Sequence, residues 1–195
     1  MHSNIPDAAA LQTILARRSA WPLTKPGPSP DELETILQAA AVAPDHACLH
    51  PWHFKVVQGN NRLTLLQQVL QHADAQTEQV KALQGKYTLK LTTAPVVIVL
   101  AARLTQHPKA PGFEQMLSAG AAVMNMLNAA HLLGYSGFWS STPAPLDNLL
   151  HKVMQFEEQD RMIGLLNLGK PASSERNYAP RVKWQSYAQL WQKVE

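Results

Sequence analysis

The sequence is poor in charged residues and has almost no cysteine. Only 16% of its 195 residues are Asp, Glu, Lys or Arg, whereas about 25% is usual in globular domains. A lone subunit of this size needs a charged surface, so either a partner covers part of it or uncharged polar side chains replace the charges. The single cysteine, Cys48, excludes an intrachain disulfide framework and a four-cysteine zinc site, and it is typical of a reducing compartment.

The signatures of several common functions are also missing. The sequence has no G-x-G-x-x-G fingerprint, P-loop, G-x-S-x-G elbow or H-E-x-x-H motif, which leaves Rossmann, kinase and common hydrolase chemistry unsupported. Its first residues lack a basic segment followed by an apolar run, so we expect no signal peptide. The apolar stretch 113–134 is interrupted by polar side chains, and we interpret it as a buried helix. We therefore expect a cytoplasmic protein that enters no membrane.

The positive charge of the chain is small and dispersed. Its net charge is +3 and its pI is about 9.1. The 17 basic residues form no stripe of the kind that binds nucleic acid. The sequence therefore predicts no nucleic-acid partner, and a small anionic ligand is a better match for a few of these cations.

Predicted strands and helices alternate along a chain whose length suits one domain, residues 1–195. The unbroken apolar run 95–101 predicts a strand that is covered on both faces. Ser29, followed by Pro30 and two acids, predicts the start of a helix. The alternation favours α+β or α/β architecture, with helices on both faces of one sheet. Further strands are expected at 53–58, 136–140 and 162–168, and further helices at 8–18, 62–72, 78–90, 113–134 and 146–154.

Two adjacent arginines and a serine stand where the first expected helix ends. Arg17 and Arg18 offer planar donor forks, and Ser19 adds a hydroxyl donor, so the three side chains suit a phosphate group. The alternative is a solvated basic helix end that complements the helix dipole.

The segment APDHACLHPW, residues 43–52, concentrates reactive side chains between prolines. His46, His50 and His53 could bind a metal ion, but the flanking prolines leave too short a segment for the helix that this spacing needs. Cys48 could act as a nucleophile if a histidine lowered its pKa. The third alternative is a rigid loop that places Trp52 in the core.

Together, these segments and others in the same order resemble the FMN-dependent nitroreductase family, and in particular its short single-domain branch. The resemblance covers about residues 11–171. The matching positions are Arg17-Arg18-Ser19, Ala43-Pro44 with Pro51-Trp52, Ala94-Pro95 and the strand after it, the helix from Ser118, the segment Gly134–Ser141, and Leu168-Gly169-Lys170-Pro171.

The resemblance implies a three-layer α+β fold, in which helices flank a central mixed but mainly antiparallel sheet. It also implies an intertwined homodimer with two FMN sites at the interface. The tail, residues 172–195, has four large aromatic side chains and would dock on the partner subunit. The implied reaction passes electrons from NADH or NADPH through flavin to a nitroaromatic, quinone or similar small acceptor, in ping-pong order. It does not strictly require a protein acid or base, so no catalytic residue is assigned.

Particular residues receive roles from the same resemblance. Arg17, Arg18 and Ser19 would hold the flavin phosphate and ribityl chain, the 43–52 loop of the other subunit would lie against the flavin ring, and the end of the 136–140 strand would lie near that ring. Lys170, Arg176 and Arg181 are the candidates for closing the phosphate site. The implied cofactor-binding residues are Arg17, Arg18, Ser19, Pro44, Asp45, His46, Cys48, His50, Trp139, Ser140, Ser141, Gly169 and Lys170.

The sequence also departs from the family pattern. Loop positions that hold Ser, Asn and Gln in the family are Asp45, Cys48 and His50 here, and Trp21 replaces a common basic residue. That cation would favour the reduced flavin at its N1/O2 edge. Two alternatives therefore stay open: a flavin-binding carrier or sensor with little turnover, and a thiol enzyme that uses Cys48 with a histidine. Candidates to replace the cation are Arg18, Lys81, Lys86 and Lys90.

Overall fold

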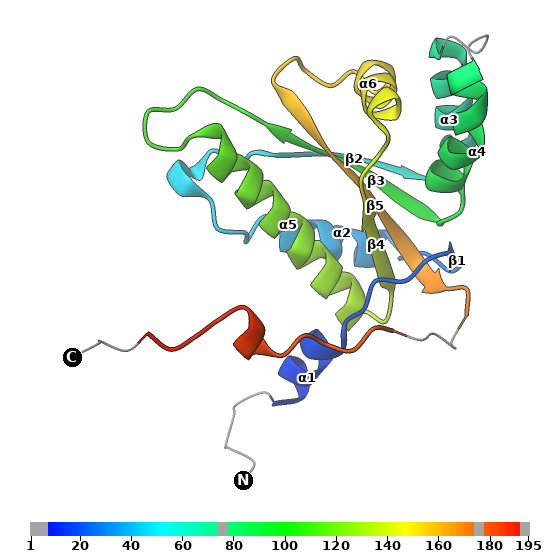
Figure 1. Cartoon of the computed structure of the whole chain (residues 1–195). Helices are drawn as coiled ribbons and strands as arrows, with labels where there is room; N and C mark the ends of the chain where they lie inside the picture. Colours follow the sequence, from blue (N-terminus) through cyan, green and yellow to red (C-terminus); the bar gives the residue numbers. More distant parts are fainter. Residues whose placement is uncertain (1–7, 74–77, 174–177, 192–195) are drawn as a thin grey trace.

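In the computed structural model, helices and strands follow one another along residues 8–73, 78–173 and 178–191, which are the residues the structure describes (Figure 1). Most of the predicted elements are present, and their ends lie within a few residues of the predicted ones. The order is α1 (Ala8–Ala16), β1 (Leu23–Thr24), α2 (Pro30–Ala40), η1 (His46–Cys48), β2 (Trp52–Gln58), α3 (Asn61–His72), α4 (Glu78–Thr92), β3 (Val96–Arg103), α5 (Gly112–Leu132), β4 (Ser136–Ser140), α6 (Ala144–Val153), β5 (Asp160–Pro171) and η2 (Trp184–Ser186).

The sheet is organised around β5, whose 12 residues allow it to pair with three other strands. One edge of β5 binds β3 along most of its length, with Val96 opposite Leu168. The other strands beside β5 are β4, with Ser136 opposite Gly169, and β1 at its far end. All pairings among the described strands are antiparallel, which confirms the α+β fold. The expected mixed sheet is therefore antiparallel throughout these strands.

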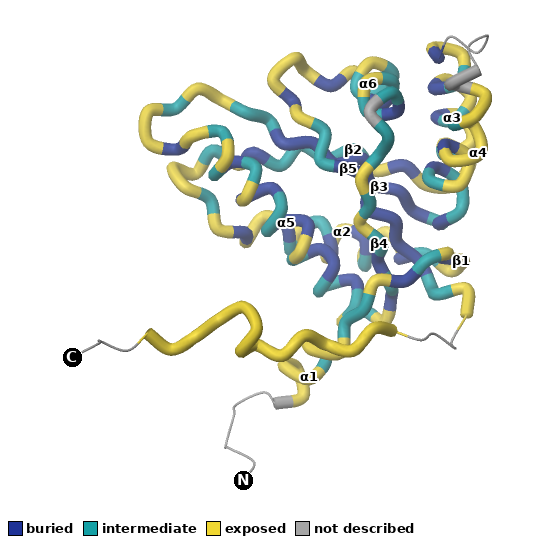
Figure 2. Tube along the Cα trace, in the orientation of Figure 1, coloured by how far each residue is buried: buried dark blue, intermediate teal, exposed yellow. Residues whose placement is uncertain are grey.

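Helices cover both faces of this sheet and form two apolar cores. On one face, α2 and α5 pack against Ile98 and Leu100 of β3. On the other face, α3, α4 and α6 pack against Val97 and Val99. Consecutive β3 residues point to opposite faces, so both sets are buried, and this explains the unbroken apolar run in the sequence (Figures 1 and 2).

The ends of α2 and α5 follow the local signals in the sequence. Ser29 and Glu32 form a reciprocal capping box, in which Ser29 N–H donates to Glu32 Oε2 at 2.8 Å. Gly134 adopts a φ of +78° just after α5, and Tyr135 N–H donates to the Ala130 carbonyl at 2.8 Å. This left-handed residue reverses the chain into β4.

Two exposed regions lie outside the cores. Residues 178–191 run beside α1 and away from the sheet, and Figure 2 shows them exposed throughout. Their Trp191 side chain is 86% exposed. The outer side of α5 also exposes large apolar residues, including Phe113 and Leu117. Over the described ranges, no helix has the length and apolarity needed to span a membrane.

Candidate functional site

Three guanidinium groups gather where α1 ends. Arg181 Nη2 donates to the Leu15 carbonyl at 2.8 Å and also to the Arg17 carbonyl, while Arg18 Nη1 donates to the Ala179 carbonyl at 3.1 Å. Burial lowers the pKa of Arg17, and the charges of Arg181 and Arg18 lower it further. Arg17 Nη1 is buried and has no hydrogen-bond partner within the described part of the chain. The cluster is therefore suited to a multiply charged anion, which would relieve the repulsion and satisfy this donor.

The structure separates the late basic residues that the sequence could not rank. Arg181 belongs to the arginine cluster. Lys170 instead donates to the Gly134 carbonyl, and its ammonium lies 4.1 Å from the centre of the Tyr135 ring. Arg176 lies outside the described residues. Gly169 has a packing role, because a Cβ there would lie 2.7 Å from the Thr24 carbonyl oxygen.

A second group forms at the C-terminal end of β4. Lys90 of α4 donates to Ser140 Oγ at 3.0 Å and to the Ser141 carbonyl at 2.7 Å. Burial lowers the pKa of Lys90, and the charge of Asp147 opposes that effect. A desolvated cation is thus fixed beside the serines that the resemblance placed near the flavin ring.

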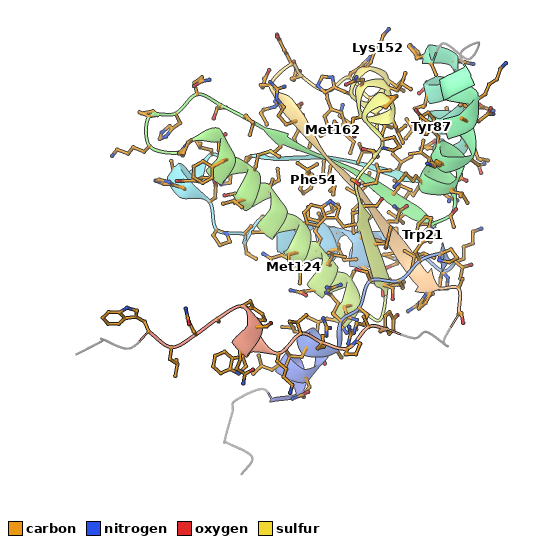
Figure 3. All side chains as sticks on the ribbon, viewed as in Figure 1. Trp21, Phe54, Tyr87, Met124, Lys152 and Met162 are labelled. Carbon is orange, nitrogen blue, oxygen red and sulfur yellow. The ribbon has the colours of Figure 1, made fainter. Side chains whose placement is uncertain are left out.

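Aromatic side chains form the wall of a small cavity next to this lysine. The rings of Trp21 and Phe138 are 5.3 Å apart, and Figure 3 shows Trp21 on the side of the sheet that carries α4. The cavity has a volume of about 210 Å³ and is lined by Trp21, Lys86, Leu89, Lys90, Phe138 and Ser140. Of the candidate lysines, Lys90 contacts the site serines, and Lys86 lines the same cavity.

Trp139 lies on the other side of β4 from Ser140. Its Nε1–H donates to the Ile163 carbonyl at 2.9 Å, and its ring lies 3.8 Å from the position that a Cβ on Gly120 of α5 would occupy. Because neighbouring strand residues point to opposite faces, Trp139 and Ser140 cannot contact the same side of one ligand from this strand.

The 43–52 loop is held in an unusual backbone conformation. Ala47, Cys48 and His50 have φ values of 67°, 52° and 50°, a region that costs non-glycine residues on the order of 1–3 kcal/mol each. Asp45 Oδ2 accepts a hydrogen bond from His50 N–H at 2.6 Å, which ties the loop together. Such strain persists where the surrounding structure enforces it, and it often marks a functional site.

Neither alternative chemistry of this loop finds support in the structure. His46 pairs with Glu114 at 2.6 Å, whereas His53 pairs with Asp160 at 2.9 Å. No cluster of three or more metal-ligating side chains occurs within the described ranges. Cys48 is exposed, and no histidine hydrogen-bonds its thiol in the part of the chain that the structure describes.

The loop and the arginine cluster lie at opposite ends of α5. Glu114, the partner of His46, is in the first turn of α5, whereas α1, which ends just before Arg17, lies beside the last turns (Figure 1). The 21 residues of α5 span about 30 Å at 1.5 Å per residue. One small ligand therefore cannot touch both sets of residues within a single chain.

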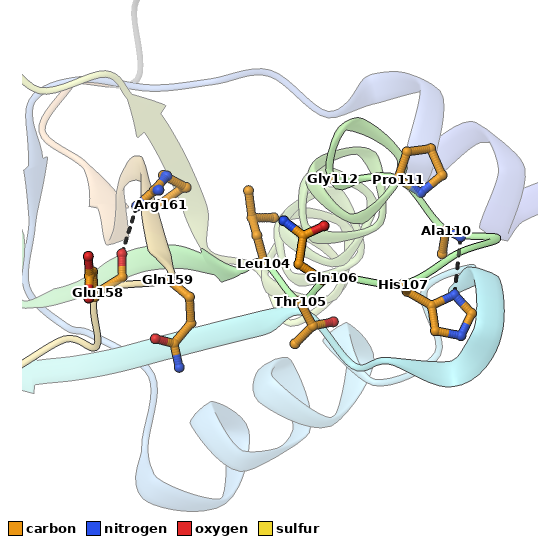
Figure 4. Close-up of a pocket in the computed structure, with 10 residues that line it drawn as sticks. All are labelled: Leu104, Thr105, Gln106, His107, Ala110, Pro111, Gly112, Glu158, Gln159 and Arg161. Atoms are coloured by element: carbon orange, nitrogen blue, oxygen red, sulfur yellow. Dashed lines mark hydrogen bonds between the residues drawn. The ribbon is translucent and has the colours of Figure 1, made fainter.

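A further cavity was not predicted from the sequence. It has a volume of about 430 Å³ and lies between the β3–α5 and α6–β5 loops (Figure 4). The Gln115 side chain fixes the first loop through three hydrogen bonds. It accepts one from Thr105 N–H and donates to the carbonyls of Thr105 and Ala110. The lining residues are Leu104, Thr105, Gln106, His107, Ala110, Pro111, Gly112, Glu158, Gln159 and Arg161.

Sequence reasoning missed Glu114 and Asp147 as parts of these sites. In the sequence, Glu114 is one of the polar residues that interrupt an apolar stretch, and Asp147 lies in an expected helix. No local pattern links either residue to its partner, because His46 and Lys90 are each more than fifty positions away in the sequence.

Known proteins of one family are similar to this chain. The model of the Nitroreductase family matches residues 14–170. A candidate NAD(P)H nitroreductase of Escherichia coli (strain K12), YdjA, is 36% identical over 162 residues, which are 83% of this chain and 88% of that protein.

Solved structures share the fold. A nitroreductase-like protein from Bacillus cereus has a TM-score of 0.79 and 22% identity, over 97% of this chain and 99% of its own. A variant of NfnB, an FMN- and NADPH-dependent nitroreductase from Sphigopyxis sp. strain HMH, has a TM-score of 0.75 and 16% identity, over 95% of this chain and 99% of its own. Matched along most of its length by the family model and by a relative of similar size, the chain belongs to the nitroreductase family.

Proposed function

We propose that the protein is an FMN-dependent oxidoreductase that takes electrons from NADH or NADPH and passes them to a nitroaromatic, quinone or similar small acceptor. The observation that carries the proposal is the arginine cluster of Arg17, Arg18 and Arg181, in which a buried guanidinium nitrogen has no described partner. The names of YdjA and NfnB support the same chemistry. Bound FMN would supply the hydride chemistry, accepting from NAD(P)H and donating to the acceptor.

Two groups of side chains would hold FMN, one at each end of the molecule. The three arginines, with the exposed Ser19 beside them, would bind the phosphate, whose doubly charged oxygens match guanidinium donors. Lys90 would place a positive charge at the N1/O2 edge of the flavin, assisted by Ser140 and the Ser141 segment. Lys90 would then perform the task of the basic residue that Trp21 replaces, which removes the main reason to expect a flavin carrier with little turnover.

The site would be completed by a second copy of the chain. Within one chain, Pro44, Asp45, His46, Cys48 and His50 are about the length of α5 away from the arginines, so the loop can reach a flavin only across a subunit interface. Exposed apolar side chains on α5 and on the tail, Leu117 and Trp191 among them, would be covered in that homodimer. This accounts for the low charge content, because part of each surface would be removed from water.

Two further properties belong to the proposal. NAD(P)H and the electron acceptor would bind in turn at the same place beside the flavin, the second only after the first has left. This order predicts ping-pong kinetics. The cytoplasm is the compartment we propose, since the lone Cys48 suits reducing conditions.

The absorption spectrum of the purified protein tests the function. We expect the protein to take up FMN, to be yellow, and to lose its colour when NADPH is added without oxygen. Colour that resists NADPH would support a flavin carrier instead. A protein that stays colourless with added FMN would refute flavin binding, and loss of activity in Cys48→Ser would then favour a thiol enzyme.

A further inference from the structure

A histidine–glutamate pair connects the strained loop to the start of α5. His46 Nδ1 lies 2.6 Å from Glu114 Oε2, and the side chains are 52% and 34% exposed. Because a carboxylate can only accept, Nδ1 carries the hydrogen of this short, charge-assisted bond. The other ring nitrogen, Nε2, is therefore the atom of His46 that can exchange a proton with a ligand or with water.

The loop backbone presents His46 in a fixed position. His46 is preceded by Asp45, whose carboxylate accepts a hydrogen bond from His50 N–H, and is followed by Ala47 and Cys48, which have a left-handed backbone conformation. Cys48 N–H donates to the Asp45 carbonyl at 3.3 Å. With Glu114 holding the ring and these bonds holding the backbone, His46 has little freedom to turn away.

The pair faces a cavity that can hold a small ring. The cavity has a volume of about 300 Å³, at the lower end of the range of about 300–1,000 Å³ for small-molecule sites. Three of its lining side chains are ionisable, namely Asp45, His46 and Glu114. The remaining lining is mostly apolar: Pro44, Leu117, Ser118 and Ala121.

We propose that His46 donates a proton to the electron acceptor and that Glu114 positions and charge-balances its imidazolium. The inference rests on the proposed function, in which this loop lies beside the flavin of the partner subunit. Two-electron reduction of a quinone consumes two electrons and two protons. A hydride carries both electrons and one proton to one quinone oxygen, and an acid must supply the second proton.

The transfer balances on His46. The Nε2–H bond breaks as an O–H bond forms at the second quinone oxygen, which yields the hydroquinone and a neutral imidazole. Nδ1–H stays bonded to Glu114 throughout, so the neutral ring is the tautomer that Glu114 favours. Before the next turnover, the neutral imidazole takes a proton back from water at Nε2, the ring nitrogen that Glu114 leaves free.

Comparing two acceptors separates proton donation from a purely structural role. Enzyme loaded with FMN and reduced by NADPH is mixed with benzoquinone, which needs protons, or with ferricyanide, which takes single electrons and no proton. For His46→Ala we expect the ratio of the benzoquinone rate to the ferricyanide rate to fall by about 10²-fold, the lower end of general acid catalysis. Glu114→Leu should lower the same rate ratio by about tenfold. Added imidazole should raise the ratio in His46→Ala.

A matched control and a measurement without turnover complete the test. His72→Ala removes an exposed histidine of α3 whose ring contacts the Gln68 carbonyl, and the rate ratio should stay within about twofold. Nitrogen-15 NMR of the flavin-free protein should show neutral His46 protonated at Nδ1, and Glu114→Leu should abolish that preference.

The outcomes distinguish this proposal from the function on which it rests. Equal losses with both acceptors, an unchanged ratio, or an Nε2–H tautomer in the unsubstituted protein would overturn proton donation by His46 while leaving the flavin enzyme intact. A protein that takes up no FMN overturns both proposals. Circular dichroism of each variant identifies any loss of rate that comes from unfolding, and imidazole rescue of a folded His46→Ala supports the proposal independently.

Discussion

Replacing Arg17 with alanine tests the phosphate site through two measurements that should move in different directions. Arg17 Nη1 is buried and unpartnered in the described structure, so an FMN phosphate would give it the hydrogen bond that it lacks. A hydrogen bond to a charged group contributes about 1.5–3 kcal/mol. The Kd for FMN should therefore rise by about 10- to 150-fold.

The stability of the flavin-free protein should not fall in the same variant. Burial and the charges of Arg181 and Arg18 lower the pKa of Arg17. A cation whose pKa is lowered on folding destabilises the folded state wherever it is charged, here at every practical pH. Removing Arg17 should thus leave the Tm of the flavin-free protein unchanged or raised.

Thermal unfolding with and without FMN measures both effects. At FMN equal to about 100 times the Kd of the unsubstituted protein, binding stabilises by about 2.7 kcal/mol, and a 20-fold weaker Kd reduces this to about 1 kcal/mol. Arg161→Ala is the control, because Arg161 is exposed and bonds only the nearby Glu158 carbonyl among the described contacts. An unchanged Kd, or an equal loss of Tm with and without FMN, would refute the assignment.

Four further substitutions test other parts of the structure. Lys90→Met should make the midpoint potential of the bound flavin more negative than Lys86→Met does, because only the first removes the cation held by Ser140 and Ser141; equal potentials in redox titration would contradict this. Burial raises the pKa of Asp160, but hydrogen bonds from Arg103, Glu157 N–H and His53 outweigh it and bring the pKa to about 2. Because the pKa of Asp160 is lower in the folded state, its ionised carboxylate should stabilise the fold by about 2 kcal/mol above about pH 4, and this stabilisation should be lost as the pH falls towards 2. Denaturant titrations of Asp160→Asn should show no such pH dependence. Gly164→Ala should lower the Tm, since φ is +115° and the new Cβ would lie 2.4 Å from the Ser140 carbonyl oxygen; a loss of about 1–3 kcal/mol is expected, and an unchanged melting curve would be inconsistent with this geometry. Leu117→Glu should shift sedimentation from a dimer towards the 21.5 kDa monomer, and a stable folded monomer of the unsubstituted chain would contradict the shared site.

The elements of the fold could be predicted where their signals are local. β3 was identified by an unbroken apolar run because both of its faces are covered, and α2 by Ser29 followed at once by Pro30 and two acids. β1 was not predicted from the sequence because it has two residues, Leu23 and Thr24, which form a strand through their pairing with Pro171 and Lys170. β5 extends beyond its predicted ends for the same reason, since its partners decide its length.

The sequence by itself determined the alternation of elements, the two-sided burial of β3 and the order of motifs that the family shares, because each depends on residues close together in the chain. Tertiary structure alone decided which distant residues meet: Arg181 rather than Lys170 with Arg17, Lys90 with Ser140, and His46 with Glu114. It also placed the arginine cluster and the 43–52 loop at opposite ends of α5. The reason is physical, since proximity between distant residues follows from how helices pack on a sheet, and no local spacing records that packing.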